Sequence, residues 1–407
     1  MDGLLISPGH VGLVGLAAAP GVTGWLPSDL FALSQPGIWL DGSDNSVMWQ
    51  DAAGTTPVTA LGQPVGLILD KRLWGGKTYA QVMAEQPELL PNSFSSATWV
   101  INDGLSSISS GTLHLLSNSL TGGAILSPAN GSPYNASKAH EVELVVSDFV
   151  KGGVRVFTGS GYTSGFTSNG TFKFKVVFPA DQNIRVYGVT TDNDLKVRIS
   201  IKEIPGNHAY QTTSGSRPLW QEDANGARGL KPDGVDDFLV TPSIDFSASD
   251  KMLVSAGVRK LSDASSAILA ELSAVVDTNN GTFAITAPGN NGVNKFSFSS
   301  RGTIFVASPT TDTTYNAPIS VVASGLADIG SDICRLRLNG SQISQSTADQ
   351  GSGAYGNYPL YIGRRGGSSL PFNGFAHQLV VRGGDLPDAA TIAQLEAYIA
   401  GKSGVSL

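Results

Sequence analysis

Aromatic and hydrogen-bonding side chains gather in one glycine-rich stretch, "DQGSGAYGNYPLYIGRRGG" at 349–367. Sugars are bound by aromatic rings that stack on their apolar faces and by amide or charged groups that hydrogen-bond their hydroxyls. The stretch therefore predicts a ligand-binding loop. Its candidate residues are Tyr355, Asn357, Tyr358, Arg364 and Arg365. The alternative interpretation is that these tyrosines pack inside a loop or against another subunit.

Oxygen-rich turns offer a second kind of chemistry, because Ca²⁺ is held by carboxylate, amide and carbonyl oxygens. The turn "VVDTNNGT" at 275–282 supplies Asp277 and Asn279 as candidate calcium ligands, and "TTDNDLK" at 190–196 is similar in composition. Neither turn has the spacing of an EF-hand loop, and the first is also an ordinary hairpin turn. No other cofactor is expected.

Catalytic residues are not expected. Glycoside hydrolysis needs paired carboxyl groups. Glu141 and Glu143 in "EVELVV" share one face, but no third acid follows in register, so the solvated face of a strand explains them better. The five histidines lack metal-ligand spacing. The single cysteine, Cys334, falls on the apolar face of an alternating strand, where a buried thiol is inert. We therefore expect a protein that is not an enzyme.

The composition favours many short strands joined by tight turns. Charged residues make up 14% of the chain and 49 residues are glycine, whereas long surface helices need Glu and Lys. The formal charge of -7 offers no basic surface for nucleic acid. No run of about 20 apolar residues is present, so we expect no membrane insertion. The apolar N-terminus does not match a signal peptide, because Asp2 replaces the basic region.

The chain divides into three segments. Residues 1–90 are irregular and contain four of the six tryptophans, which must be buried against something, so we expect an extended docking arm. The arm's candidate contact residues are Trp25, Trp39, Trp49 and Trp74. Residues 91–205 contain period-two patterns such as "FKFKVVF" and "LKVRISI", which predict a β-sandwich. Residues 206–407 contain further strand patterns and end in one helical pattern.

This last pattern, at 386–401, predicts an amphipathic helix with Asp388 as its N-cap and Gly401 as its C-cap. Its apolar stripe consists of Ile392, Leu395, Tyr398 and Ile399. The predicted fold class is all-β: two β-sandwich (jelly-roll) domains, an extended N-terminal arm and one C-terminal capping helix.

Residues 206–407 resemble the laminin G / concanavalin A-like lectin superfamily. The resemblance rests on "ARGLKPDGVDDFLVTPS" at 227–243, similar to the opening strand signature of that family, and on the stretch 358–400, similar to its closing pattern. His377 and Gln378 depart from that pattern, since an acidic residue is common there. The resemblance implies a jelly-roll sandwich and a closing helix that caps it.

The stretches "PGIWLDGSDNSVMWQDAAGTTPVTALGQPVGLILDK" at 36–71 and "SGSRPLWQEDANGARGLKPDGVDDFL" at 214–239 resemble phrases found in virion proteins of tailed bacteriophages. The resemblance implies a tail fibre, spike or head fibre in the virion, made in the host cytoplasm. We expect non-catalytic attachment to a host-surface glycan, contact with other virion proteins through the arm, and a homo-oligomer, most simply a trimer. A purely structural or decoration protein and a polysaccharide depolymerase are the alternatives.

Overall fold

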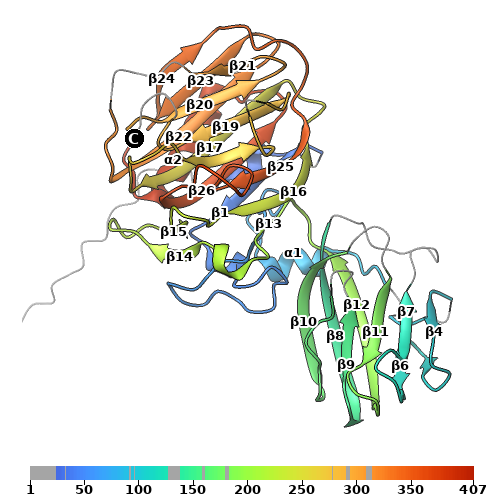
Figure 1. The fold of residues 1–407 in the computed structure, drawn as a ribbon. Coiled ribbons are helices and arrows are strands. Elements are labelled where there is room, and N and C mark those ends of the chain that lie inside the picture. The colour runs from blue at the N-terminus through green and yellow to red at the C-terminus, as the bar shows by residue number, and fades with distance from the viewer. Residues whose placement is uncertain are drawn as a thin grey trace, which may run out of the picture.

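Alternating apolar and polar residues form antiparallel strands through most of the chain. The computed structural model describes residues 24–407 except 33, 91–92, 96, 127–137, 158–160, 179–182, 277, 290–293 and 309–313. Strand β12 (Asp194–Glu203) illustrates the local rule, because its apolar residues are buried and the polar ones between them are more exposed. Within the described residues the strands form four sheets that pair into two sandwiches (Figure 1).

The larger pair of sheets, here the main sandwich, has one sheet of eight strands and one of nine. The eight-stranded sheet follows the order β14-β15-β26-β17-β22-β23-β24, and β1 also pairs with β26. Its strands are β1 (Gly37–Asp41), β14 (Leu219–Glu222), β15 (Arg228–Lys231), β17 (Lys251–Lys260), β22 (Ile319–Asp328), β23 (Ile333–Leu338), β24 (Ser341–Ser346) and β26 (Gly374–Gly383).

The nine-stranded sheet follows the order β2-β3-β13-β16-β25-β18-β19-β20-β21. Its strands are β2 (Met48–Trp49), β3 (Leu67–Ile68), β13 (Ala209–Tyr210), β16 (Leu239–Asp245), β18 (Ile268–Leu272), β19 (Thr282–Thr286), β20 (Ser297–Arg301), β21 (Phe305–Ala307) and β25 (Asn357–Ile362). The two inner faces meet in one apolar core that includes Val254, Phe283 and Leu360. Cys334 is fully buried in it, and burial raises the pKa of its thiol to about 12.

The smaller pair, here the inserted sandwich, is a five-stranded sheet in the order β10-β8-β12-β6-β5 and a four-stranded sheet in the order β4-β7-β11-β9. Its remaining strands are β4 (Trp99–Ile101), β5 (Ser107–Ser109), β6 (Thr112–Leu115), β7 (Gly123–Leu126), β8 (Ala139–Lys151), β9 (Val154–Phe157), β10 (Gly170–Val177) and β11 (Ile184–Gly188). A separate core of residues such as Leu144, Val186 and Ile199 fills the space between these sheets.

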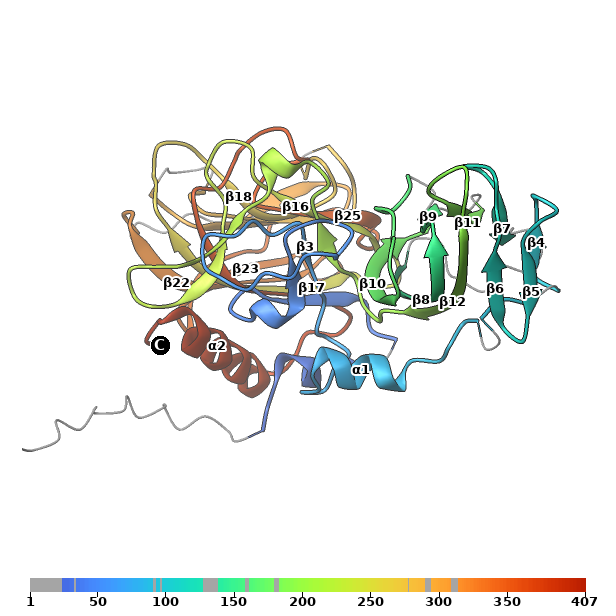
Figure 2. The ribbon, with the colours of Figure 1, turned by 90° about the horizontal axis from the view of Figure 1, so that it is seen from below.

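The main sandwich is discontinuous in sequence. Strands β1, β2 and β3 precede the inserted sandwich, and β13 follows it, yet β3 pairs directly with β13 through Ala209 opposite Ile68. The chain leaves through helix α1 (Tyr79–Glu85), which begins at a capping box between Thr78 and Gln81. Figure 2 shows α1 running from the main sandwich toward the inserted one.

This connectivity corrects the expected arm over residues 24–90. Strand β1 pairs with β26 along its whole length, from Gly37 opposite Arg382 to Asp41 opposite Gln378. Trp39, Trp49 and Trp74 of this segment are buried by the same chain and Trp25 is half-buried, so the three buried tryptophans need no neighbour to cover them. The rest of the predicted arm, residues 1–23, lies outside the described residues.

The C-terminal helix α2 (Ala389–Ser403) confirms the predicted closing element. Asp388 is its N-cap and accepts a hydrogen bond from the backbone N–H of Thr391 at 2.7 Å. The C-cap is Gly404 rather than the predicted Gly401, because Gly404 takes the left-handed conformation (φ 63°) that ends the helix. The helix packs on the outer face of the eight-stranded sheet through Leu395 and Ile399 (Figure 2). No helix in the described part of the chain is long and apolar enough to cross a membrane.

Candidate functional site

A cleft of about 1050 Å³ lies between the two sandwiches. One wall is the edge strand β10 with the loop that precedes it, and the other wall consists of the 51–56 loop, Tyr210 and Pro242 of the main sandwich. The cleft exists because the inserted sandwich leaves and re-enters the main one at neighbouring points of the nine-stranded sheet. Its volume is at the upper end of the range usual for ligand pockets, about 300–1,000 Å³.

Lys175 of β10 is the most constrained charge of the cleft. Its side chain is 6% exposed, and its ammonium lies 3.8 Å from the centre of the Trp49 ring and 5.0 Å from that of Tyr79. Its backbone N–H donates to the carbonyl of Ala53 at 2.7 Å. Gly54 permits this approach, because a Cβ there would lie 2.6 Å from the Lys175 side chain. The lysine therefore joins the two sandwiches at the edge of the cleft.

Burial lowers the pKa of Lys175 to about 8, and the negative charge of Glu141 opposes this effect. The Glu141 carboxylate is 3.9 Å from the ammonium, beyond hydrogen-bond distance, and it accepts instead from the Tyr79 hydroxyl at 2.7 Å. Lys175 thus brings a poorly solvated positive charge to the cleft, held mainly by aromatic rings. Such a group is available to a ligand that offers oxygen acceptors.

Aromatic rings form the outer part of the same wall. Tyr162 is 38% exposed, and the guanidinium of Arg155 lies 4.1 Å from the centre of its ring. Phe172 stacks on Phe166 with ring centres 4.5 Å apart. Together with the half-buried Tyr210 across the cleft, these rings provide flat apolar surface beside polar groups.

Besides Lys175, the polar lining includes hydroxyl groups and two groups, Asp51 and His208, that already have hydrogen-bond partners within the chain. The Asp51 carboxylate accepts hydrogen bonds from the backbone and side chain of Thr55 and from the backbone of Thr56. Burial lowers the pKa of His208 to about 4, so its ring is neutral; Nδ1 accepts from the N–H of Asp70 at 2.9 Å. Among the described residues that line the cleft, Asp51 is the one carboxylate.

The predicted ligand loop is arranged differently. Tyr355 is 1% exposed, its hydroxyl shares a 2.6 Å hydrogen bond with Ser300, and its ring packs edge-on to Phe283. Tyr355 is therefore a core residue, and no face of its ring is open to a sugar. This agrees with the alternative interpretation, in which the tyrosine packs inside the protein. Asn357 and Tyr358 begin strand β25 rather than lying in a loop.

The two predicted arginines support the loop after β25. The Arg364 guanidinium donates to the carbonyls of Ser368 and Asp236, at 3.1 Å and 3.4 Å. That of Arg365 donates to the buried Glu271 carboxylate at 3.2 Å. None of the five predicted residues lines the cleft.

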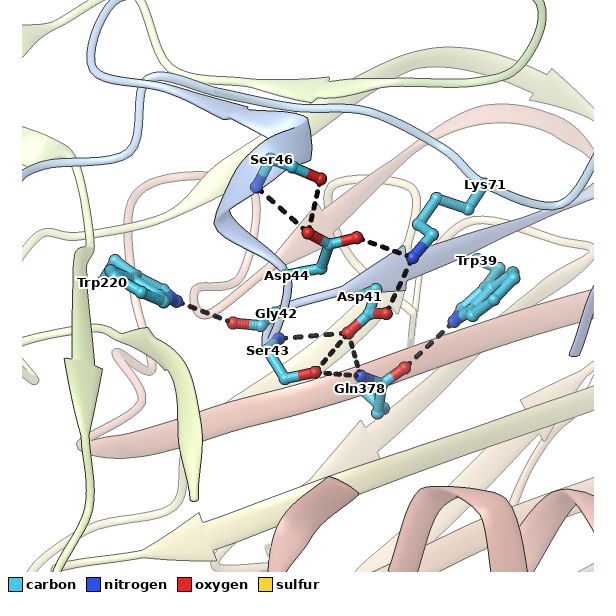
Figure 3. Close-up of polar contacts among 9 residues, drawn as sticks. All are labelled: Trp39, Asp41, Gly42, Ser43, Asp44, Ser46, Lys71, Trp220 and Gln378. Carbon is cyan, nitrogen blue, oxygen red and sulfur yellow. Dashed lines mark hydrogen bonds and ion pairs between the residues drawn. The ribbon is translucent and has the colours of Figure 1, made fainter. Parts of the chain in front are cut away.

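The predicted docking tryptophans pack within the chain. The half-buried Trp25 and the buried Trp39 both contact Tyr398 edge-on, and Trp49 and Trp74 both pack on Tyr79. Figure 3 shows the Trp39 indole N–H donating to Gln378, whose amide nitrogen in turn donates to the Asp41 carboxylate. The two hydrogen bonds of Gln378 attach the first segment to β26.

The predicted calcium site lies partly outside the described residues and stays a prediction. Asp277 lies outside the described residues, and the amide nitrogen of Asn279 donates to the Ser273 hydroxyl at 3.0 Å. Sequence analysis missed a different group, Asp233, Asp236 and Asp237, whose carboxylate oxygens lie within 4.8 Å of one another. Burial and then the charge of Asp233 raise the pKa of Asp237 to about 7. In the sequence these three acids are visible as the stretch "DGVDD" at 233–237.

Comparison with known proteins gives fold-level similarity to parts of carbohydrate-active and toxin proteins. Domain 4 of AbnA, a GH43 extracellular arabinanase from Geobacillus stearothermophilus in complex with arabinotriose, is 14% identical, covers 44% of this chain and 81% of its own, and has a TM-score of 0.36. The Ruminococcus gnavus IT-sialidase CBM40 bound to α2,3 sialyllactose is 15% identical, covers 41% of this chain and 95% of its own, with a TM-score of 0.31.

The binding domain of botulinum neurotoxin DC in complex with rat synaptotagmin II is 11% identical, covers 47% of this chain and 49% of its own, with a TM-score of 0.33. No protein-family model and no curated protein matches the chain.

Proposed function

We propose that this chain is a virion appendage protein of a tailed bacteriophage that attaches, without catalysis, to a host-surface glycan in the cleft between its two sandwiches. The observation that carries the proposal is the lining of the cleft: exposed and half-buried aromatic rings beside hydroxyl groups and a poorly solvated ammonium. Glycan sites combine these elements, because each sugar unit has an apolar face and a rim of hydroxyls. The resemblance of residues 36–71 and 214–239 to phage virion proteins supports the location in the virion.

The charges of the cleft favour binding over hydrolysis. Cleavage of a glycosidic bond uses two carboxyl groups about 5–10 Å apart on either side of the bond. Asp51 faces the cleft without a second acid among the described lining residues, and its oxygens are occupied by Thr55 and Thr56. In the proposed virion the chain forms a homotrimer and contacts other virion proteins.

A glycan array with matched aromatic variants tests the proposal. Tyr162→Ala removes a 38% exposed ring from the cleft wall, and Phe305→Ala removes a 37% exposed ring from strand β21 of the main sandwich, outside the cleft. We expect the wild-type chain to bind a defined set of glycans. Tyr162→Ala should bind them at least about tenfold more weakly, which is a loss of about 1.4 kcal/mol in binding free energy. Phe305→Ala should bind them with unchanged affinity. Absence of binding by the wild-type chain to every glycan, or equal binding by both variants, would contradict attachment through the cleft and favour a structural role.

A further inference from the structure

Strand β10 lines the cleft with its edge. Seven consecutive residues of the strand, 171–177, belong to the cleft wall. Successive side chains of a strand point to opposite faces of its sheet, so a wall that includes every residue of a stretch is formed by the strand edge. Strand β8 covers the other edge of β10 through residues 139–146. Of the strands of the inserted sandwich, β10 lies nearest to the main sandwich (Figure 1, Figure 2).

The backbone groups of alternate residues of β10 point into the cleft. In an antiparallel pair, the N–H and C=O of one residue both face the neighbouring strand, and those of the next residue both face away from it. The Lys175 N–H donates to the carbonyl of Ala53, a residue of the opposite wall, so the backbone of Lys175 faces away from β8. The register between β10 and β8 is regular, and the backbones of Thr171 and Lys173 therefore face the same way as that of Lys175.

Most of these outward groups have no partner. Among the described residues, no hydrogen bond is formed by the backbone N–H or C=O of Thr171 and Lys173, nor by the C=O of Lys175. The stretch from Thr171 to Lys175 is about 13 Å long, at about 3.3 Å per residue. Along it stand two N–H donors and three C=O acceptors, held in place by the pairing of β10 with β8. Such preorganised groups bind a ligand with little loss of conformational entropy.

The 51–56 loop limits what can lie along this edge. Ala53 already takes the place of an added strand at Lys175, and Gly54 lies directly against the Lys175 side chain. A peptide strand added to β10 would therefore collide with Ala53 and pair only with residues 171–174, whereas strands are usually about 5–6 residues long. A sugar chain needs no continuous ladder, because each of its hydroxyls both donates and accepts.

The spacing of the open groups favours a chain over a single sugar. The backbones of Thr171 and Lys173 are about 7 Å apart along the strand. One sugar unit would reach the groups of one residue and leave those of the next residue in water. A ligand that uses both sets extends along β10.

We infer that the cleft takes an internal, unbranched segment of a polysaccharide, several sugar units long, laid along the edge of β10. Its hydroxyls accept from the N–H groups of Thr171 and Lys173 and donate to the open carbonyls up to Lys175. Its apolar ring faces lie against Tyr162 and Tyr210, which line the same cleft. The inference rests on the proposed function, since it names the class of glycan that the cleft holds.

The glycan array, extended with linear glucan, chitin, mannan and galacturonan chains of one to six units, tests the inference. We expect the full chain to bind linear glycans of three or more units, and the single unit of the same sugar at least about tenfold more weakly. This part of the test needs no variant, so it does not depend on how any substitution affects folding.

Proline variants of β10 test the contact with the backbone. Thr171→Pro and Lys173→Pro each remove one N–H that points into the cleft, and proline is tolerated in an edge strand where its nitrogen faces away from the sheet. Thr171→Val and Lys173→Met are the matched counterparts, because they remove the polar side chain and keep the N–H. Each proline variant should bind the tightest linear glycan at least about tenfold more weakly than its counterpart, with a similar urea midpoint of unfolding.

Equal affinity for the single unit and the longer chains overturns the inference, and so does binding of branched or terminal structures alone. Equal affinity of each proline variant and its counterpart also overturns it. In these cases a loss of array binding in Tyr162→Ala leaves the cleft and the proposed function standing. An array without any binding overturns both. Binding of a hexapeptide of alternating threonine and valine, by a chain that binds no glycan, would replace both with strand addition to β10.

Discussion

Replacing Lys175 by methionine should stabilise the chain and weaken glycan binding at the same time. The side chain is 6% exposed, and burial lowers its pKa from 10.5 to about 8. This difference corresponds to about 3 kcal/mol against folding with the charged form, because each tenfold change in proton affinity is about 1.4 kcal/mol. Methionine loses the contact of the ammonium with Trp49 and Tyr79, which contributes about 0.5–2 kcal/mol. The expected net gain at pH 7 is about 2 kcal/mol.

The gain should depend on pH in a defined direction. Between pH 8 and 10.5 the unfolded chain binds more protons at this lysine than the folded chain does, so the stability of the wild-type protein rises with pH there. The advantage of Lys175→Met is therefore complete below pH 8 and lost as the pH approaches 10.5. The weaker glycan binding follows from the loss of the poorly solvated Lys175 ammonium at the cleft.

Urea denaturation followed by tryptophan fluorescence, at pH 7 and at pH 10, measures the difference in free energy of unfolding between the two proteins. The matched control is Lys173→Met on the same strand, since the Lys173 side chain is 53% exposed and its ammonium pairs with Glu143 at 2.9 Å. Exposed ion pairs contribute about 0–1 kcal/mol, so this variant should be slightly less stable or unchanged. A loss of more than about 1 kcal/mol in Lys175→Met at pH 7, or a difference that does not change between the two pH values, would refute the reasoning.

Three further predictions concern stability alone. Because the pKa of Asp237 is raised to about 7, the folded chain holds a proton there that the unfolded chain releases. The free energy of unfolding should therefore fall from pH 5 to pH 8. In urea titrations at these pH values, Asp237→Asn should show a smaller fall. Leu395→Ala removes a fully buried side chain between α2 and the eight-stranded sheet and should cost about 2–5 kcal/mol, measured by the same method. Asp388→Ala removes the N-cap of α2 and should cost about 0.5–2 kcal/mol; an unchanged thermal midpoint would show that the cap contributes nothing.

The fold class followed from local patterns. Period-two segments such as "LKVRISI" form strands because one face meets a core and the other meets water. The stripe of Ile392, Leu395 and Ile399 lies on the helix that covers the outer face of the eight-stranded sheet. The helix ended one turn later than predicted. Gly401 and Gly404 are equally good C-caps by sequence, and the structure places the left-handed conformation at Gly404.

The discontinuity of the main sandwich could not be predicted in this way. Strands β2 and β3 are two residues long, too short for a local period to mark them, and β3 pairs with β13 on the far side of the inserted sandwich in sequence. The tryptophans of 24–90 indicated correctly that this segment must be buried. They could not indicate that the partner is the C-terminal half of the same chain, because composition carries no information on pairing.

The cleft was missed for the same reason. Its walls combine residues 51–56, β10 and Tyr210, which come together only through the way the inserted sandwich joins the main one. The sequence did show aromatic and amide groups around Tyr355, but the structure buries that ring between the sheets. The side-chain types in the sequence predicted the kind of ligand contact, but which aromatic side chains are exposed depends on the fold.

A crystal structure of the chain with the oligosaccharide that binds most tightly on the glycan array tests the central claim most directly. Attachment through the cleft predicts electron density for sugar between β10 and the 51–56 loop, with a ring of the sugar against Tyr162 or Tyr210. Density for the same oligosaccharide only at other surfaces of the chain, with the cleft empty, would contradict it.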